Sequence, residues 1–211
     1  MFSPKLVVVA VLVSACFLFA SVAVACSAST TDFSDNGGIL SGSNAGLSLS
    51  GSTLISVTGY PGMGSTIGDL GTVSFVTGAL SSGSLQMGGT FAAGGAFTID
   101  GNGTGGLPNA VMFSGTFSGP ATWTLTTLAN GTHNYTLTGV ITGTMGGNTR
   151  NGVTVQLAVN TGKGFFDGMT TIAGGDTALL SSVPEPSTLG MMGAGLLGLV
   201  SVLRRNAFPH I

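Results

Sequence analysis

A regular alternation of apolar residues and threonines, interrupted by glycine-containing turns, is the feature that most constrains the fold of this chain. It is clearest in residues 121–145, where apolar residues recur at every second position and the dipeptide Asn130-Gly131 separates two such runs. A period of two indicates a strand with one buried face. Asn-Gly between two such runs favours a tight hairpin, because both residues tolerate positive φ. The residues expected on the buried face are Trp123, Leu125, Tyr135, Leu137, Gly139, Ile141 and Met145.

Weaker signals of the same kind predict further strands at residues 54–57, 72–76, 90–91, 96–99, 111–117 and 164–172. In the run after residue 145, alternation predicts Val153, Val155, Leu157 and Val159 inward and Thr154, Gln156 and Asn160 outward. Residues 32–49 are rich in Ser, Gly and Asn, and we expect a poorly ordered leader or weak edge strands there. About eight short strands with frequent turns predict an all-β fold, an antiparallel β-sandwich or barrel.

The low charge of the chain excludes some classes of function. Its 211 residues include 5 Lys and Arg and 7 Asp and Glu, with a net charge of -2. Nucleic-acid binding needs clustered Lys and Arg, so no nucleic-acid partner is expected. The scarcity of acids, bases and metal ligands predicts a protein that is not an enzyme and that holds no cofactor. A hydrophobic content of 43% with 12 Phe is nevertheless too high for a disordered chain.

The N-terminus has the three parts of a secretory signal peptide. Lys5 precedes an uncharged run over residues 6–25, which ends in small residues at Ala23 and Ala25. This order predicts export through the secretory translocon and cleavage by signal peptidase, with Ala23 and Ala25 at the cleavage site. We assign residues 1–28 to the signal peptide. An uncleaved membrane anchor is the alternative, because 20 apolar residues can span a bilayer.

Both cysteines, Cys16 and Cys26, lie in this N-terminal segment. Val13-Ser14-Ala15-Cys16 resembles a bacterial lipoprotein box, and the residues before Cys26 form a poorer version. Lipidation at either cysteine therefore stays open. Ordinary cleavage leaves at most one thiol in the exported domain, which must then be held together by its own core.

The C-terminus contains three elements in a fixed order. Pro184-Glu185-Pro186 is followed by an uncharged run over residues 189–203 and then by Arg204-Arg205. This arrangement closely resembles the PEP-CTERM sorting signal of exported bacterial proteins. The resemblance implies that Pro184, Glu185 and Pro186 are the recognition element of an exosortase, a membrane protease that acts after export. We assign residues 183–211 to this sorting signal.

The physical properties of the C-terminus agree with that resemblance. Arg204 and Arg205 should remain on the cytoplasmic side of a helix over residues 189–203, which leaves Glu185 outside. Fifteen helical residues extend roughly 22 Å, less than the hydrocarbon core of about 30 Å. A transmembrane helix this short suits a transient anchor better than a permanent one.

Residues 100–105 resemble the first half of a calcium loop. Asp100, Asn102 and Thr104 supply oxygen atoms at positions one, three and five, and Gly105 follows at position six. Position twelve is Val111 rather than the Glu that binds in bidentate fashion. The three residues are thus candidate metal ligands, but a glycine-rich hairpin connection is the favoured interpretation.

Two further groups of residues are ambiguous. His133 lies beside the predicted turn, where we expect it to be exposed to solvent rather than catalytic. Five aromatic residues could form a platform for sugars, although their alternation with polar residues favours the core. They are Phe97, Phe113, Phe117, Trp123 and Tyr135.

The sequence therefore predicts a non-enzymatic exported β-domain over residues 29–182. Its expected route runs through an inner-membrane intermediate to the cell surface or the extracellular matrix. The alternative is a carbohydrate- or calcium-binding module on the same sorting system, with extracellular polysaccharide as a partner. Self-association stays open, because strand edges without charge can pair between copies.

Overall fold

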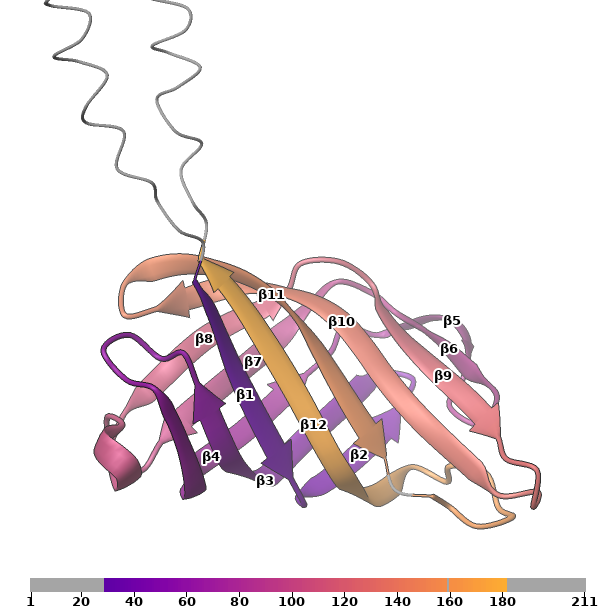
Figure 1. Cartoon of the computed structure of the whole chain (residues 1–211). Coiled ribbons are helices and arrows are strands. Elements are labelled where there is room, and N and C mark those ends of the chain that lie inside the picture. Colours follow the sequence, from indigo (N-terminus) through magenta and orange to yellow (C-terminus); the bar gives the residue numbers. More distant parts are fainter. Residues whose placement is uncertain (1–28, 159, 182–211) are drawn as a thin grey trace, which may run out of the picture. The chain divides into compact units, whose positions relative to one another are not determined.

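A computed structural model describes residues 29–158 and 160–181, which form a compact all-β unit (Figure 1). These residues contain twelve strands and one short 3-10 helix. The strands are β1 (Thr30–Asn36), β2 (Ile39–Ser43), β3 (Gly46–Thr58), β4 (Ser65–Val76), β5 (Leu80–Ser84), β6 (Gly88–Phe91), β7 (Gly94–Gly101), β8 (Val111–Phe117), β9 (Ala121–Thr127), β10 (His133–Met145), β11 (Asn148–Ala158) and β12 (Met169–Ser181), and the helix is η1 (Thr104–Gly106).

Four pairs of consecutive strands each form one longer, interrupted strand. β1 and β2 both pair antiparallel with β12 and with β3. In the same way, β8 and β9 both pair with β10. β4 pairs with β7, and β5 pairs with β6. The consecutive strands β4 and β5 thus form one pair, and β6 and β7 form another. Joining these four pairs reduces the twelve strands to eight.

The eight long strands form one closed antiparallel sheet. Each pairs with the next along the chain, and the last pairs with the first, because β12 runs antiparallel to β1 from Thr30 opposite Leu180 to Asp35 opposite Gly175. Figure 1 shows β1 and β12 side by side. The all-β antiparallel prediction is confirmed, and the sheet closes on itself instead of forming two stacked layers.

The interior of the closed sheet is packed with aromatic side chains. Phe97 stacks on Phe75, with 5.9 Å between ring centroids, and meets Phe117 edge-on at 6.0 Å. At the other end, Trp123 stacks on Tyr135 at 5.0 Å. The core interpretation of the five ambiguous aromatic residues is therefore confirmed, since all of them are buried. None of the five is available as an exposed platform for sugars.

The predicted faces of β11 are wrong. Thr154 and Gln156 are buried, whereas Val153, Val155 and Leu157 are exposed. The cause is the β10–β11 register, which places Leu137 opposite Gln156 and Gly139 opposite Thr154, and directly opposed residues share a face. Since Leu137 points inward, Gln156 must do so too. Val159 lies outside the described residues, and Asn160 is exposed as predicted.

Residues 32–49, predicted as a poorly ordered leader or weak edge strands, do form strands, but these strands are ordered and paired on both sides. This segment forms most of β1, all of β2 and the start of β3, and Phe33, Leu40 and Leu47 are fully buried. Small polar residues between these apolar ones conceal the alternation. Gly38 has φ of 76°, and a side chain there would collide with the backbone of Ser52.

The hairpin predicted around Asn130-Gly131 is confirmed, with β9 paired to β10. Its turn is wider than the predicted tight one, because residues 128–132 connect the strands and only Gly131 of the pair has positive φ, at 79°. The last predicted strand, at residues 164–172, is misplaced, because residues 160–168 form a loop and β12 begins at Met169. The predicted signal peptide and the helix at 189–203 lie outside the described residues. Within the described part of the chain, no helix is long and apolar enough to cross a bilayer.

Replacing Phe97 by Ala should lower the free energy of unfolding by about 3–5 kcal/mol, because it removes a ring packed among other buried rings. Ile67→Ala is the matched control, since Ile67 is 81% exposed and should change stability by less than about 0.5 kcal/mol. Chemical denaturation of the two variants and the wild type measures both values. Equal effects would contradict the assigned core.

Candidate functional site

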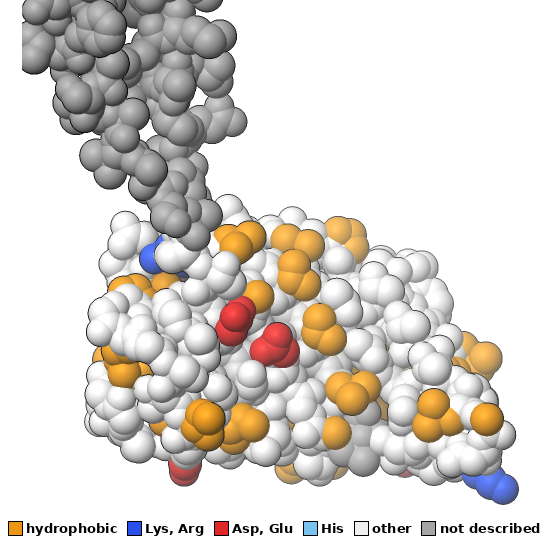
Figure 2. Space-filling model, viewed as in Figure 1, with side chains coloured by type: hydrophobic (Ala, Val, Ile, Leu, Met, Phe, Trp, Pro, Cys, Tyr) orange, Lys and Arg blue, Asp and Glu red, His pale blue; other side chains and the backbone are white. Residues whose placement is uncertain are grey.

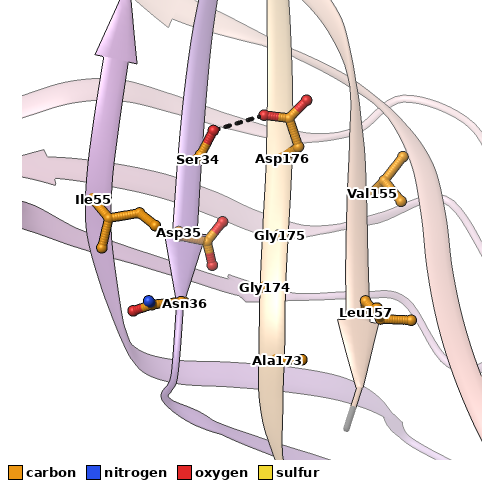
Figure 3. A pocket seen from close by; sticks show the side chains of 10 residues that line it. All are labelled: Ser34, Asp35, Asn36, Ile55, Val155, Leu157, Ala173, Gly174, Gly175 and Asp176. Atoms are coloured by element: carbon orange, nitrogen blue, oxygen red, sulfur yellow. Dashed lines mark hydrogen bonds between the residues drawn. The ribbon is translucent and has the colours of Figure 1, made fainter. Parts of the chain in front are cut away.

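One outer face of the closed sheet carries a shallow hollow with a volume of about 490 Å³. Figure 2 shows acidic side chains near the middle of this face with hydrophobic side chains around them. The hollow crosses β3, β1, β12 and β11 (Figure 3). Its lining comprises Ser34, Asp35, Asn36, Ile55, Val155, Leu157, Ala173, Gly174, Gly175 and Asp176.

The floor of the hollow carries little side-chain volume, because β12 contributes two consecutive glycines, Gly174 and Gly175, preceded by Ala173. The register places Leu157 opposite Gly174 and Val155 opposite Asp176. A bulge between Leu157 and Ala158 locally changes this pairing. The aliphatic wall on β11 thus arises from the same register that reverses the predicted faces of that strand.

The polar rim of the hollow is acidic. Asp176 is exposed, and its Oδ1 accepts a hydrogen bond of 3.1 Å from the Ser34 hydroxyl. Asp32 lies on β1 two residues from Ser34, on the same side of that strand. The basic residues of the described part of the chain are Arg150 and Lys163, and neither lines the hollow. The carboxylates at this face therefore have no basic partner in the lining.

A second carboxyl lies beneath the floor. Asp35 points into the closed sheet and is 1% exposed. Its Oδ2 accepts a 2.5 Å hydrogen bond from the Ser52 hydroxyl, and its Oδ1 accepts one of 3.2 Å from the Gln156 amide. Gln156 belongs to β11 and reaches Asp35 on β1 by passing under Gly175 of the intervening β12. The absence of a side chain at Gly175 makes that contact sterically feasible.

Burial raises the pKa of the Asp35 carboxyl above its ordinary value, because the ionised form loses its hydration. The hydrogen bonds from Ser52 and Gln156 favour the ionised form and lower this pKa, whereas the nearby charge of Asp176 raises it. Burial is the largest of these effects. The Gln156 Oε1 atom is buried and accepts no hydrogen bond from the described residues, so this interior cluster is incompletely satisfied.

Among the candidate calcium ligands, Asp100 lies at the end of β7, and Asn102 and Thr104 lie in the connection to β8. The two strands pair as the hairpin interpretation predicts. The Asn102 amide donates to the Asp69 carbonyl at 3.1 Å and carboxylate at 3.2 Å. Its own oxygen accepts the Thr104 N–H at 2.9 Å. The polar atoms of Asn102 thus stabilise the loop. Across the described segments, no group of three or more His, Cys, Asp or Glu is placed to hold a metal ion.

His133 is not the exposed turn residue that the sequence predicts. It begins β10 and is only 9% exposed. Its ring stacks on Phe165 at 4.5 Å, and Nδ1 lies 3.1 Å from the Thr127 hydroxyl. The physical reason is that residues 160–168 fold over the start of β10. No local sequence signal indicates this long-range contact.

Sequence reasoning also missed Asp35, Gln156 and the hollow. The hairpin at Gly146-Gly147, where Met145 lies opposite Asn148, could have revealed the faces of β11, because a two-residue connection determines the register. The glycine floor and the contact with β1 require the closed sheet. Neither follows from spacing along the chain.

The sorting residues Pro184, Glu185, Pro186, Arg204 and Arg205 lie outside the described residues. The same holds for the cleavage-site residues Ala23 and Ala25 and for Cys16 and Cys26.

Comparison with known families gives one match, to the PEP-CTERM protein-sorting motif, over residues 182–205. No curated protein and no solved structure matches the chain. The match begins directly after β12, which ends at Ser181. It covers the C-terminal segment and does not extend into the β-domain.

Asp35→Asn should stabilise the protein relative to wild type as the pH rises. In the wild type the folded protein holds the Asp35 proton more tightly than the unfolded chain does, because the pKa is raised on folding. The stabilising contribution of this carboxyl to the free energy of unfolding is therefore fully present below its unfolded pKa of about 3.9. It is lost as the pH rises through the folded value. Asparagine removes this loss, because it does not ionise. Urea unfolding between about pH 3 and pH 8 measures the difference. A difference that is constant over this range would contradict the prediction.

Gly175→Ala should destabilise the fold by about 1–3 kcal/mol, because the new methyl group would overlap the Gln156 amide. Gly174→Ala is the matched control, since the nearest atom to its methyl group is the Asp35 carbonyl oxygen at an ordinary 3.5 Å. Thermal or chemical unfolding of both variants tests the passage beneath β12. Equal losses at the two positions would show that Gln156 takes another path.

Proposed function

We propose that this chain, which carries a PEP-CTERM protein-sorting motif at residues 182–205, is a non-enzymatic structural protein of the cell surface or extracellular matrix. The motif implies an exported, membrane-transiting protein that an exosortase processes. The observation that carries the proposal is this motif directly after a complete β-domain. The domain would be the product that remains once both ends have been removed.

The proposed route uses both ends of the chain. Residues 1–28 direct export through the translocon and are removed by signal peptidase. The apolar run over residues 189–203 then holds the protein transiently in the inner membrane, with Arg204 and Arg205 on the cytoplasmic side. Exosortase recognises Pro184, Glu185 and Pro186 and releases the domain towards the outside.

The closed sheet is compatible with removal of both ends. Ser29 donates its N–H to the Ser181 hydroxyl at 2.9 Å, and Ser181 donates its N–H to the Ser29 carbonyl at 3.0 Å. These bonds lie at the outer limits of β1 and β12. Cleavage before residue 29 and after residue 182 would therefore remove no strand from the circuit.

A structural role is also supported by the environment of the described histidine. His133 contacts a threonine and a phenylalanine, an arrangement that stabilises a loop and lacks the acid and nucleophile of a triad. The alternative of a carbohydrate- or calcium-binding module is not favoured by the two features that suggested it. The aromatic rings are buried, and Asn102 bonds within its own loop. Calorimetry with Ca²⁺ and a glycan panel tests that alternative, and heat of binding would support it.

Glu185→Gln should block processing and leave the protein in the membrane fraction, because it removes the charge of the recognition element. Asp32→Asn is the matched control, since it removes one carboxylate from the surface of the β-domain and should be processed normally. Fractionation and intact mass of the protein from cells with and without exosortase provide the measurement. A wild-type protein that keeps its C-terminal segment when exosortase is present would overturn the proposal.

A further inference from the structure

The 160–168 loop, which joins β11 to β12, is held firmly against β10. His133 donates its N–H to the Gly162 carbonyl at 3.0 Å, and Thr161 donates its N–H to the His133 carbonyl at 3.1 Å. Within the loop, the Thr161 hydroxyl donates to the Gly164 carbonyl at 2.6 Å. The loop is therefore ordered before any partner binds, which lowers the entropic cost of binding.

This loop presents a cation and an aromatic ring to solvent, together with the carboxylate of Asp167 four residues after Lys163. Lys163 is exposed, whereas Arg150, the other described basic residue, is only 9% exposed. Phe165 is 45% exposed although one face of its ring stacks on His133. The next residue, Phe166, is buried and donates its N–H to the Tyr135 hydroxyl at 3.0 Å, which fixes the direction of the chain.

The hollow on β3, β1, β12 and β11 has the complementary chemistry. Its walls are the aliphatic side chains of Ile55, Val155 and Leu157, and its exposed charge is the Asp176 carboxylate. Its floor on β12 is formed by two glycines and an alanine. Burying an aromatic ring against aliphatic walls is favourable. Placing a cation beside a carboxylate that has no basic partner is favourable too. In Figure 2 the acidic side chains near the middle of the face and a projecting basic side chain at its lower right margin are well separated.

We propose that the 160–168 loop of one copy docks into the hollow of a second copy, with Lys163 beside Asp176 and Phe165 against Val155 and Leu157. The two surfaces are different patches of the same molecule. A contact of this kind is heterologous, so each copy can bind one neighbour through its loop and another through its hollow. The expected product is a chain or a ring of copies, according to the rotation that relates one copy to the next.

The strand pairing argues against an extended peptide as the occupant. β1 is flanked by β12 and β3, and β12 is flanked by β1 and β11, so the backbone at the hollow is already paired. A peptide could not add a strand here and would bind through side chains alone. The acidic rim also disfavours anionic surfaces. The chain's own loop supplies the required cation and ring on a rigid support.

One loop in one shallow hollow is a small contact, below the size of stable interfaces, so the association should be weak and depend on concentration. It would matter where many copies accumulate. The inference goes beyond the proposed function, because self-association can be measured whether or not exosortase processes the chain. A failure of one therefore leaves the other standing.

The test uses the full chain in an excess of nonionic detergent micelles, followed by sedimentation over a range of concentrations. Lys163→Gln and Asp176→Asn should each weaken self-association by about two- to fivefold, because each leaves the opposite charge without its partner. Raising the ionic strength should weaken the wild type in the same direction. Asp69→Asn is the control, since it removes a carboxylate from β4, outside the lining of the hollow, and should leave the association unchanged.

An equimolar mixture of the two single variants gives the sharper result. The Asp176→Asn copy keeps Lys163, and the Lys163→Gln copy keeps Asp176, so one matched contact remains and the mixture should form dimers that grow no further. Wild type should form longer chains or rings under the same conditions. A wild type that stays monomeric up to about 1 mM, or association that neither variant weakens, would overturn the proposal. So would a mixture that assembles no better than each variant alone.

Discussion

The pairing of β1 with β12 is the interaction on which the rest of this structure depends. It joins the first strand to the last, from Thr30 opposite Leu180 to Asp35 opposite Gly175, and so turns a meander of hairpins into a closed sheet. With so few charges available to protect exposed edges, closure is an effective way to satisfy the backbone groups of the outermost strands. It also brings both ends of the domain together at Ser29 and Ser181.

The register of β11 explains why the outer face has its particular chemistry. The register of β10 with β11 turns Thr154 and Gln156 inward and leaves Val155 and Leu157 outside. Gln156 then meets Asp35 beneath Gly175, and the exposed aliphatic residues line the hollow above. A buried acid and an aliphatic surface are thus two consequences of one register. Both would be reversed by a shift of one residue.

The functional information divides between the ends and the domain. The C-terminal segment carries the sorting motif, which implies export and handling by an exosortase. The domain carries surfaces outside the matched segment, namely the hollow and the 160–168 loop with its exposed Lys163. Delivery and assembly can therefore be tested separately, by changes at Glu185 and at Lys163 or Asp176.

The sequence by itself determined the elements that depend on local order along the chain. These are the sorting motif around Glu185, the strands with clear alternation such as residues 121–127, and the hairpin at Asn130-Gly131. The tertiary structure alone decided the burial of His133 and the strands hidden in residues 32–49, since His133 contacts Phe165 and β1 pairs with β12 at the other end of the domain. The same is true of the Asp35 cluster, because alternation shows which residues share a face but only pairing shows which face is inside.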